Sequence, residues 1–483
     1  MSLKVRIVQK IALFLLLFPV FDVKAAPVDA PKPWNVIIFT ADDMNGDSPG
    51  WMGNPLKPTP NLDAFASTAF RFVNHHVTVP ICQPSRSALM TGRVPHRNGA
   101  LGFNPIHVGV PTLVKMLKEN GYQTSVIDKF PHMMPESEFP WDTKGRQSGK
   151  NPPLFKKQVE EAIQASKASG KPLFLNANIT DPHRPFPGGD SGKINAKKKA
   201  EGSDENQGRP LKVFKPDEIR VPSFLEDIPD VRREIAQYYT AVSRLDQTFK
   251  GAMEALRAAD MEKNSIILFL SDHGMSMPFS KASVYRNGTW SPLLVRFPKM
   301  PAAKTMDELV SSVDILPTIL DVLGMPHPQG LDGRSLLPLM EGEKQAGRDY
   351  VVTHVNTVSS GKSFPQRCIR TRDYSLHFHA WTNGQPIFRV EAMNGVTFNA
   401  LANAGKNNPA IQARVSQYQV GVPLALYDLT NDPDERKNLL NETRLGVELE
   451  RLASLLVDHM EKTNDPQTMN FKKALQARKA VKK

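Results

Sequence analysis

Residues 34–43 read WNVIIFTADD, and this stretch decides the fold class. Its first seven residues are almost all apolar, as in a strand buried on both faces of a parallel sheet, and the run stops at two aspartates. A second apolar run, SIILFL at residues 265–270, is followed by Asp272 and His273. Because ligands bind beyond the carboxyl ends of parallel strands, the two runs predict one shared polar site at that edge.

Helical patterns alternate with these strands. Apolar residues recur at helical spacing over residues 232–260, and a shorter helix is expected over residues 112–120. The segment LFLNAN at residues 173–178 has the pattern of another core strand. This alternation predicts an α/β domain built on a large, mostly parallel central sheet.

The pattern changes near residue 350. Short strand-like runs follow at residues 350–353 and 425–427, and a helix is expected from Glu442 to about Lys462. We therefore divide the chain into a main α/β domain over residues 26–350, a smaller α+β domain with an antiparallel sheet over residues 351–470, and a basic, frayed tail over residues 471–483.

Composition places the chain among globular proteins. Of its 483 residues, 40% are hydrophobic and 23% are charged, which excludes wholesale disorder and a collagen-like repeat. The formal net charge of +12 is concentrated at the ends, since residues 1–25 contribute +3 and the tail from Phe471 contributes +6, which leaves +3 for the body. A nearly neutral body lacks the basic face that nucleic-acid binding requires.

The N-terminus has the pattern of an export signal. Basic residues precede an apolar run over residues 11–21, and Ala25 and Ala26 offer a cleavage site, so a signal peptide is predicted over residues 1–25. A membrane anchor is the alternative, although the run is shorter than the ~20 residues that a spanning helix needs. We expect a mature protein without a stable membrane span in a periplasmic, secreted or lysosomal-type compartment.

The chain has two cysteines, Cys82 and Cys368, which are too few for a disulfide framework. Either they form one bridge, or at least one of them has a chemical role that an oxidising compartment would endanger. If Cys82 has that role, Cys368 is expected to be a buried free thiol.

The acidic residues that follow the two apolar runs predict a metal site. Asp42, Asp43 and Asp272 would repel one another strongly if they met without a cation. Oxygen ligands favour Ca²⁺, and less strongly Mg²⁺, over zinc, although His273 adds a nitrogen that Ca²⁺ does not usually prefer. The alternative is that these acids cap helices or face solvent, which explains either pair alone better than both together.

Residues 82–93 read CQPSRSALMTGR and resemble the signature of the type I sulfatase family. In that family the cysteine is oxidised to formylglycine, and the proline and arginine that follow, here Pro84 and Arg86, guide the maturation. The resemblance extends over nearly the whole mature chain, through residues 35–43, 60–63, 312–318, 426–429, 432–433 and 438–439. It implies an alkaline-phosphatase-like sandwich fold and a sulfatase activity.

The resemblance also implies roles for single residues. The ligands of one Ca²⁺ per chain would be Asp42, Asp43, Asp272, His273 and the modified side chain at Cys82. The remaining catalytic residues would be Arg86, which stabilises the hydrated aldehyde, and a sulfate pocket and acid/base set of Lys129, His132, His183 and Lys281. His273 stands where many members have asparagine, and the spacing from Lys129 to His132 is similar to that of iduronate-2-sulfatases.

These side chains also suit the chemistry. A metal beside one hydroxyl of the hydrated aldehyde lowers the pKa of that hydroxyl so that it can attack sulfur, while Lys129 and Lys281 hold the sulfuryl oxygens. We expect His183 to protonate the leaving group, and His132 to take a proton from the second hydroxyl, which expels sulfate and regenerates the aldehyde. Any one of these histidines taken alone has the alternative of a structural role.

The sequence indicates the substrate less clearly than the type of reaction. Residues 237–298 are most similar to the heparan N-sulfatases, or sulfamidases, although Lys281 stands where those enzymes have arginine. The resemblance implies action on sulfate esters or sulfamates of a sulfated glycan such as heparan sulfate, after activation by a formylglycine-generating enzyme. We expect His96, Arg97, Arg184 and the polar loop 188–210 at the pocket rim.

Two other functions compete with this one. The nearer is a phosphoester or phosphonate ester hydrolase of the alkaline phosphatase superfamily, some members of which share the modified cysteine. The second is a secreted glycan-binding protein with a vestigial site, which would keep an unmodified Cys82 and need no metal.

Overall fold

The computed structural model describes residues 34–188 and 208–481. The predicted signal peptide and most of the polar loop 188–210 lie outside the described residues. Among the described residues, no helix is long and apolar enough to cross a bilayer.

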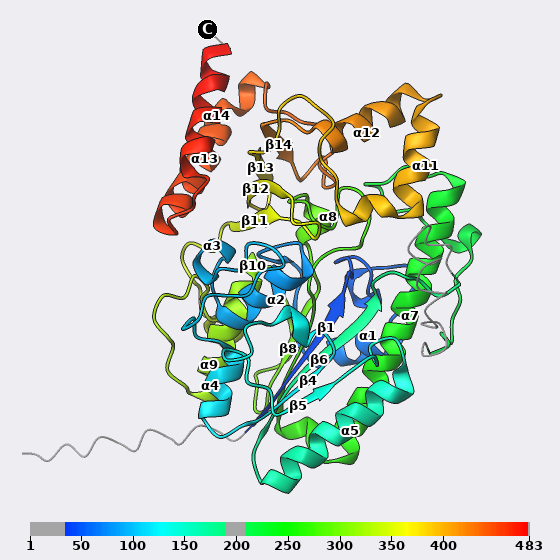
Figure 1. The fold of residues 1–483 in the computed structure, drawn as a ribbon, viewed down its shortest axis with the longest axis vertical. Helices are drawn as coiled ribbons and strands as arrows, with labels where there is room; N and C mark the ends of the chain where they lie inside the picture. Colours follow the sequence, from blue (N-terminus) through cyan, green and yellow to red (C-terminus); the bar gives the residue numbers. More distant parts are fainter. Residues whose placement is uncertain (1–33, 189–207, 482–483) are drawn as a thin grey trace, which may run out of the picture.

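A large central sheet organises the first two-thirds of the chain (Figure 1). Its eight strands lie in the order β5-β4-β6-β1-β7-β8-β2-β9. The strands are β1 (Asn35–Asp42), β2 (Phe70–Phe72), β4 (Gln123–Ile127), β5 (Thr143–Gly145), β6 (Leu173–Pro182), β7 (Ser265–Ser271), β8 (Leu293–Arg296) and β9 (Thr305–Met306). Neighbours are parallel except where β8 pairs with β7 and β2, so the predicted large, mostly parallel sheet is confirmed.

The two apolar runs of the sequence lie side by side at the centre of this sheet. All residues of β1 and β7 are buried, as their sequences predict. Ala41 pairs with Ser271 in the register of these parallel strands. The next residues, Asp42 and Asp272, therefore leave the sheet together at its carboxyl edge.

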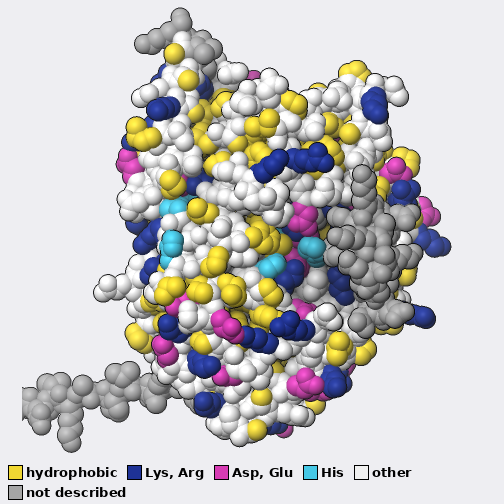
Figure 2. All heavy atoms as spheres, viewed as in Figure 1, with side chains coloured by type: hydrophobic (Ala, Val, Ile, Leu, Met, Phe, Trp, Pro, Cys, Tyr) yellow, Lys and Arg dark blue, Asp and Glu magenta, His cyan; other side chains and the backbone are white. Residues whose placement is uncertain are grey.

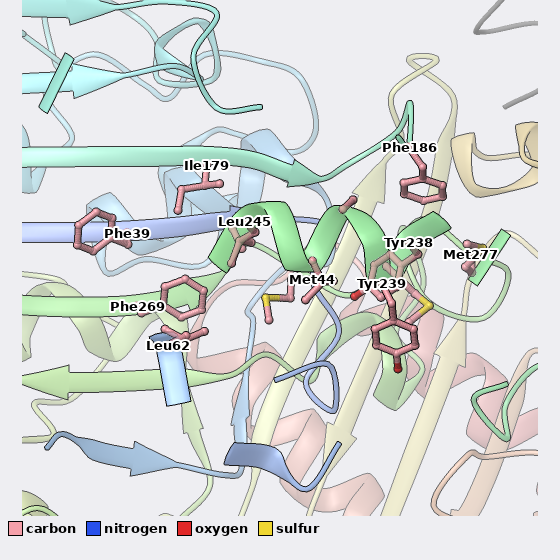
Figure 3. Packing of buried hydrophobic residues seen from close by; sticks show 14 of the residues in the cluster. Phe39, Met44, Leu62, Ile179, Phe186, Tyr238, Tyr239, Leu245, Phe269 and Met277 are labelled. Carbon is pink, nitrogen blue, oxygen red and sulfur yellow. The ribbon is translucent and has the colours of Figure 1, made fainter. Parts of the chain in front are cut away.

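Helices cover both faces of the central sheet (Figure 1). One face packs against α1 (Pro60–Ala66), α5 (Pro152–Ser169) and α7 (Pro229–Ala258), and the other against α2 (Cys82–Thr91), α4 (Leu113–Glu119) and α9 (Ile315–Leu323). Alternate residues of β1 point to opposite faces of the sheet. Phe39 packs in the same core as Leu245 of α7, whereas Ile38 packs in the other core, with Leu113 of α4. Figure 3 shows Phe39, Phe269 and Leu245 packed in the first of these cores.

A second, antiparallel sheet follows in the C-terminal part, as predicted. Its order is β11 (Val351–Thr357), β12 (Ser363–Arg370), β13 (Tyr374–His379) and β14 (Leu424–Asp428). One face packs against α13 (Gly446–Lys462) and α14 (Thr468–Val481). Val355 and Tyr427 instead join the core of the central sheet, so both sheets share apolar contacts. The domain boundary at residue 350 stays a prediction.

Short elements complete the described part of the chain. The helices are α3 (Pro95–Asn98), α8 (Arg286–Thr289), α10 (Leu337–Met340), α11 (Val396–Gly405) and α12 (Pro409–Val420), and β3 (His75–His76) pairs with β10 (Val310–Ser311). The 3-10 helices are η1 (Gly50–Met52), η2 (Phe130–His132), η3 (Pro216–Glu218), η4 (Glu262–Asn264), η5 (Ser312–Asp314), η6 (Glu391–Asn394) and η7 (Thr443–Leu445).

The prediction of a frayed tail from residue 471 is wrong. Helix α14 continues to Val481, and Phe471 is fully buried against Phe378 of β13, with ring centroids 5.2 Å apart. Ala474 and Leu475 recur one turn later and are partly buried against the same core. This apolar stripe, which is hidden among basic residues in the sequence, holds the helix on the sheet.

The two cysteines do not form a disulfide. Cys82 and Cys368 are both free and buried. The prediction that Cys368 is a buried free thiol is therefore confirmed.

Candidate active site

Three buried carboxylates meet at the carboxyl edge of the central sheet. Asp42 ends β1, Asp43 follows it, and Asp272 follows β7, each with at most 2% of its surface exposed. Asp43 has a positive φ of 70°, uncommon for a residue other than glycine, and its backbone N–H donates to Oδ1 of Asp272 at 3.1 Å. This sharp turn brings the acids of two strands into contact.

Cys82 faces this acidic group from the first residue of α2. Its Sγ lies 3.7 Å from Oδ1 of Asp42 and 3.2 Å from Nε2 of His273. Burial raises the pKa of the Cys82 thiol well above its usual value. An unmodified thiol here is therefore protonated at neutral pH and is a poor nucleophile.

Each carboxylate has a cationic partner. Arg86 Nη2 lies 2.8 Å from Oδ2 of Asp272, Lys281 Nζ lies 2.9 Å from Oδ1 of Asp43, and Lys129 pairs with Asp42. Burial opposes the charged form of Lys281, but the negative charges around it, first that of Asp43, together outweigh burial and raise the pKa of Lys281 well above its usual value. Burial likewise opposes ionisation of Asp42, but the cationic groups around it, first Lys129, together outweigh burial and keep the pKa of Asp42 well below its usual value.

His183 lies at the partly exposed side of the group. Its Nδ1 lies 2.5 Å from the carbonyl oxygen of Arg184, which can only accept, so this nitrogen carries a proton. Its Nε2 lies 3.4 Å from Oε1 of Glu391 and 4.0 Å from Oδ2 of Asp43. Acceptors therefore face both ring nitrogens.

His132 has the opposite surroundings. Burial, and after it the charge of Lys129, lower the pKa of His132 to about 3, so the ring is neutral. Its Nδ1 is buried without a hydrogen-bond partner, and its ring packs edge-on against Phe103. A neutral imidazole with an uncommitted nitrogen suits a proton acceptor. Figure 2 shows histidine, acidic and basic side chains gathered near the middle of the face in view.

The residues present fit a divalent cation. Donor atoms of Asp42, Asp43, Cys82 and His273 lie within 4.8 Å of one another, and all four residues are buried. Nδ1 of His273 lies 2.9 Å from the carbonyl oxygen of Gly274, which leaves Nε2 with its lone pair toward the group. Asp272 flanks these donors, with its Oδ1 3.7 Å from Nε2 of His273.

Comparison with known proteins assigns the family. A model described as "Sulfatase" matches residues 34–325, more than half of the chain. The chain belongs to the sulfatase family. It is thus a sulfuric ester hydrolase, and the predicted family resemblance is confirmed. A second model, "N-sulphoglucosamine sulphohydrolase, C-terminal", matches residues 272–399.

This sulfatase is similar to one curated relative and to two solved structures. Human N-sulphoglucosamine sulphohydrolase is 30% identical over 469 residues, which cover 90% of this chain and 91% of the relative. A solved enzyme in complex with its substrate D-glucosamine-2-N,6-O-disulfate is 19% identical with a TM-score of 0.66, over 90% of this chain and 99% of the other. The phosphonate monoester hydrolase of Agrobacterium radiobacter is 18% identical with a TM-score of 0.64, over 89% and 96%. The two structures support the fold alone.

The structure of this sulfatase brings the predicted site residues together. They form one connected group: Asp42, Asp43, Cys82, Arg86, Lys129, His132, His183, Asp272, His273 and Lys281. Their roles are part of the proposal below.

The predicted rim is wrong in three places. Arg184 is 4% exposed, and its guanidinium pairs with the buried Glu234 at 2.8 Å. Arg97 pairs with Asp332, and His96 binds the carbonyl oxygen of Thr463 through Nε2. Nearness in sequence to site residues does not set the side to which these residues point. The predicted contribution of the loop 188–210 lies almost wholly outside the described residues.

Two site residues of this sulfatase were not predicted. Asn178, in the second half of β6, accepts a hydrogen bond from Arg86 through Oδ1 and donates from its own amide to the carbonyl oxygen of Ile127. Glu391 reaches the site from η6 in the C-terminal part, where Oε1 lies 3.4 Å from both Nε2 of His183 and Nζ of Lys281. Asn178 follows a strand pattern that marks this edge, whereas nothing in the sequence around Glu391 signals a site.

Proposed function

We propose that this sulfatase hydrolyses sulfate esters or sulfamates of a sulfated glycan, with a formylglycine made from Cys82 as the nucleophile. The observation that carries the proposal is the position of Cys82, buried at the start of α2, 3.7 Å from Asp42 and 3.2 Å from His273. Burial raises the pKa of its thiol well above the usual value, which makes the thiol a poor nucleophile, and conversion to a hydrated aldehyde would supply a hydroxyl nucleophile in its place.

Asp42, Asp43, Asp272, His273 and the modified Cys82 would hold the metal. The bound cation, which we propose to be Ca²⁺, would polarise the nucleophile and the sulfuryl group. Three carboxylates already face three cationic side chains here, so a divalent ion leaves the site with a net positive charge. That balance favours an anionic group such as sulfate.

Lys129 and Lys281 would hold the sulfuryl oxygens. Both ammonium groups are anchored on carboxylates of the site, Lys129 on Asp42 and Lys281 on Asp43. Lys281 is 2% exposed, and a cation fixed in so dry a place stabilises developing charge more strongly than one in water. Arg86 is held on Asp272 and Asn178, where it would orient the modified Cys82.

His183 would be the acid that protonates the leaving oxygen or nitrogen. Its Nδ1 is fixed by the carbonyl of Arg184, and Glu391 would keep the Nε2 proton in place. His132, whose ring is neutral because its pKa is about 3, would accept a proton when sulfate departs. The two histidines have opposite surroundings, as an acid and a base require.

A sulfated glucosamine is the substrate class that the relatives support best. The human relative is named for a sulfamate of glucosamine, and the solved neighbour binds a glucosamine with N- and O-sulfates. Glu391 adds a carboxylate beside His183 that can accept a hydrogen bond from a sugar hydroxyl or amine. Export through the predicted signal peptide, cleaved near residue 25, and maturation by a formylglycine-generating enzyme complete the proposal.

Phosphonate monoester hydrolases share the fold, so the choice between sulfate and phosphate needs a direct test. Protein from a host with the maturation enzyme is analysed by peptide mass spectrometry across Cys82, beside assays with N-sulfated and 6-O-sulfated glucosamine. A formylglycine mass and sulfate release are expected. Preference of the mature enzyme for p-nitrophenyl phosphate over p-nitrophenyl sulfate would overturn the sulfatase proposal. An unmodified Cys82 without activity, beside an active control sulfatase, would support a vestigial site.

A further inference from the structure

A second cluster of histidines lies apart from the active site, where α3 meets β11 and the end of α13. His96 of α3, His354 of β11 and Asp465, which follows α13, have donor atoms within 4.8 Å of one another. His459 of α13 packs beside His354, with ring centroids 5.5 Å apart. Segments that are far apart in sequence thus bring two imidazoles to one carboxylate, with a third imidazole beside His354.

Several ring nitrogens of this cluster lack a hydrogen bond. His354 has no exposed surface, and neither of its ring nitrogens has a hydrogen bond. Nδ1 of His96 and Nε2 of His459 are also buried and without a hydrogen bond. Burying an unpaired polar atom is unfavourable, and several of them pointing into one cluster suggest a ligand between them.

The separations suit a small metal ion. Oδ2 of Asp465 lies 3.6 Å from Nδ1 of His354 and 3.9 Å from Nδ1 of His96. Two ligands of a tetrahedral zinc ion, each bound at about 2.0–2.1 Å, lie about 3.3 Å apart. Movements of a few tenths of an ångström would therefore bring these three atoms into coordination.

Outer contacts already orient His96 and Asp465. Nε2 of His96 lies 3.1 Å from the carbonyl oxygen of Thr463, so it carries the proton and leaves the lone pair of Nδ1 toward the cluster. Arg367 holds Asp465 through two hydrogen bonds of 2.5 and 2.8 Å. Burial lowers the pKa of His354 well below its usual value, so its ring is neutral, as metal binding requires.

The donor set also fits a metal. Two or three imidazoles with one carboxylate favour a transition metal of the zinc class over Ca²⁺. His459, beside the cluster, lines a cavity of about 400 Å³ together with Asp458 and Lys462.

We propose that His96, His354 and Asp465, with His459 as the neighbouring fourth donor, form a second metal site for a zinc-class transition metal. This ion would tie α3 of the catalytic part to β11 and α13 of the C-terminal part. Its role is structural, since none of its donors contacts the active-site residues.

The test uses the full mature protein, stripped with a chelator and reloaded with Ca²⁺. Zinc is then added, and unbound zinc is removed. The zinc that stays bound per chain is measured by elemental mass spectrometry for the wild type and for His96→Gln and His354→Gln. The matched control is His327→Gln, a half-exposed histidine outside the cluster. The wild type and the control are expected to bind one more zinc per chain than the two cluster variants, and zinc is expected to raise the melting temperature of the first pair by several degrees.

Cobalt(II) gives a second readout. Binding at the cluster would produce a ligand-field absorption that is lost in His96→Gln and His354→Gln, whereas binding at the active site would leave the absorption unchanged in both variants. Equal zinc content in the wild type and both variants, or no zinc in any of them, would overturn the proposal. If His354→Gln does not fold, His96→Gln decides alone, because His96 lies closer to the surface and already keeps one nitrogen on a backbone carbonyl.

Discussion

At the scale of single residues, the candidate active site of this sulfatase depends on pairs of opposite charges that compensate each other. Asp42 and Lys129, Asp43 and Lys281, and Asp272 and Arg86 are buried ion pairs at one edge of a sheet. Removing one member of such a pair leaves an uncompensated buried charge, so these positions are poor choices for testing catalysis alone. Cys82 and Glu391 are better, since conservative substitutions change their chemistry with little change of volume.

Substitution of Cys82 by serine removes the residue that maturation would oxidise. We expect Cys82→Ser from the maturation-competent host to lose sulfate release by a factor of roughly 10⁴ or more, the scale seen when a nucleophile is removed. Its melting temperature should stay close to that of the wild type, because the hydroxyl fits the same buried place. Measurable sulfate release at more than a hundredth of the wild-type rate would contradict the assigned nucleophile.

Glu391 is expected to position the proton of His183. The effect of this role on the rate depends on whether the leaving group needs a proton. Glu391→Gln should lower kcat for a sugar sulfate roughly 10- to 100-fold, part of the 10²–10⁴ that general acid catalysis supplies. An aryl sulfate, whose phenolate leaves without a proton, should lose less than about threefold.

The control for this prediction is Glu343→Gln, an exposed glutamate in the same half of the chain. Partial recovery of the sugar-sulfate rate is expected for Glu391→Asp, which keeps the charge. Equal losses on both substrates would assign Glu391 a purely structural role.

At the scale of elements, α14 packs on the C-terminal sheet through a few apolar residues that lie among basic ones in the sequence. Phe471 is fully buried on Phe378, whereas Met469, two residues away on the same helix, is 62% exposed. Phe471→Ala is expected to lower the free energy of unfolding by about 3–5 kcal/mol, the cost of truncating a buried aromatic side chain. Met469→Ala should change it by less than about 0.5 kcal/mol. Denaturant unfolding followed by fluorescence measures both, and similar values for the two variants would show that α14 does not dock.

The elements also show what could be predicted from the sequence. Strands β1 and β7 are buried on both faces, so their apolar runs and terminal acids were visible, and with them most of the site. The element η6 has no periodicity, and the contact of Glu391 with His183 joins residues 208 positions apart, which no local pattern records. His96 was misplaced because a helix of four residues gives no periodic signal of its buried side.

At the scale of the whole molecule, the two sheets act as one unit. The core of the central sheet includes Val355 and Tyr427 of the C-terminal sheet, and Glu391 crosses from the C-terminal part into the active site. The proposed second metal site lies in a further contact between these parts, where His96 meets His354. Residues that hold the two parts together and a residue of the active site therefore lie in the same junction.

A buried ion pair in the C-terminal part makes the stability of the whole chain depend on pH. His377 Nε2 lies 3.1 Å from Oε1 of Glu435, and both residues are fully buried. Burial opposes protonation of His377, but Cys368 and Glu435 outweigh it and raise the pKa of His377 to about 9. Burial also opposes ionisation of Glu435, but Arg370 and His377 outweigh it and lower the pKa of Glu435.

The sign of the effect follows from these shifts. A histidine whose pKa is raised from about 6.5 to about 9 stabilises the fold fully below pH 6.5, and this stabilisation is lost as the pH rises to 9. Glu435 acts in the opposite direction, since its contribution is present above pH 4.5 and is lost as the pH falls below that value. This pair therefore stabilises the chain most between about pH 4.5 and 6.5.

We expect the free energy of unfolding to fall by about 3 kcal/mol between pH 6.5 and 9 on account of His377, at 1.36 kcal/mol per pKa unit. Urea unfolding at half-unit steps of pH measures this slope. His377→Gln should lower stability at pH 6 and remove most of the decline toward pH 9, whereas His107→Gln, an exposed histidine, should leave both unchanged. A decline of the same size in His377→Gln would assign the pH dependence to other groups, because the side chain of glutamine cannot lose a proton in this range.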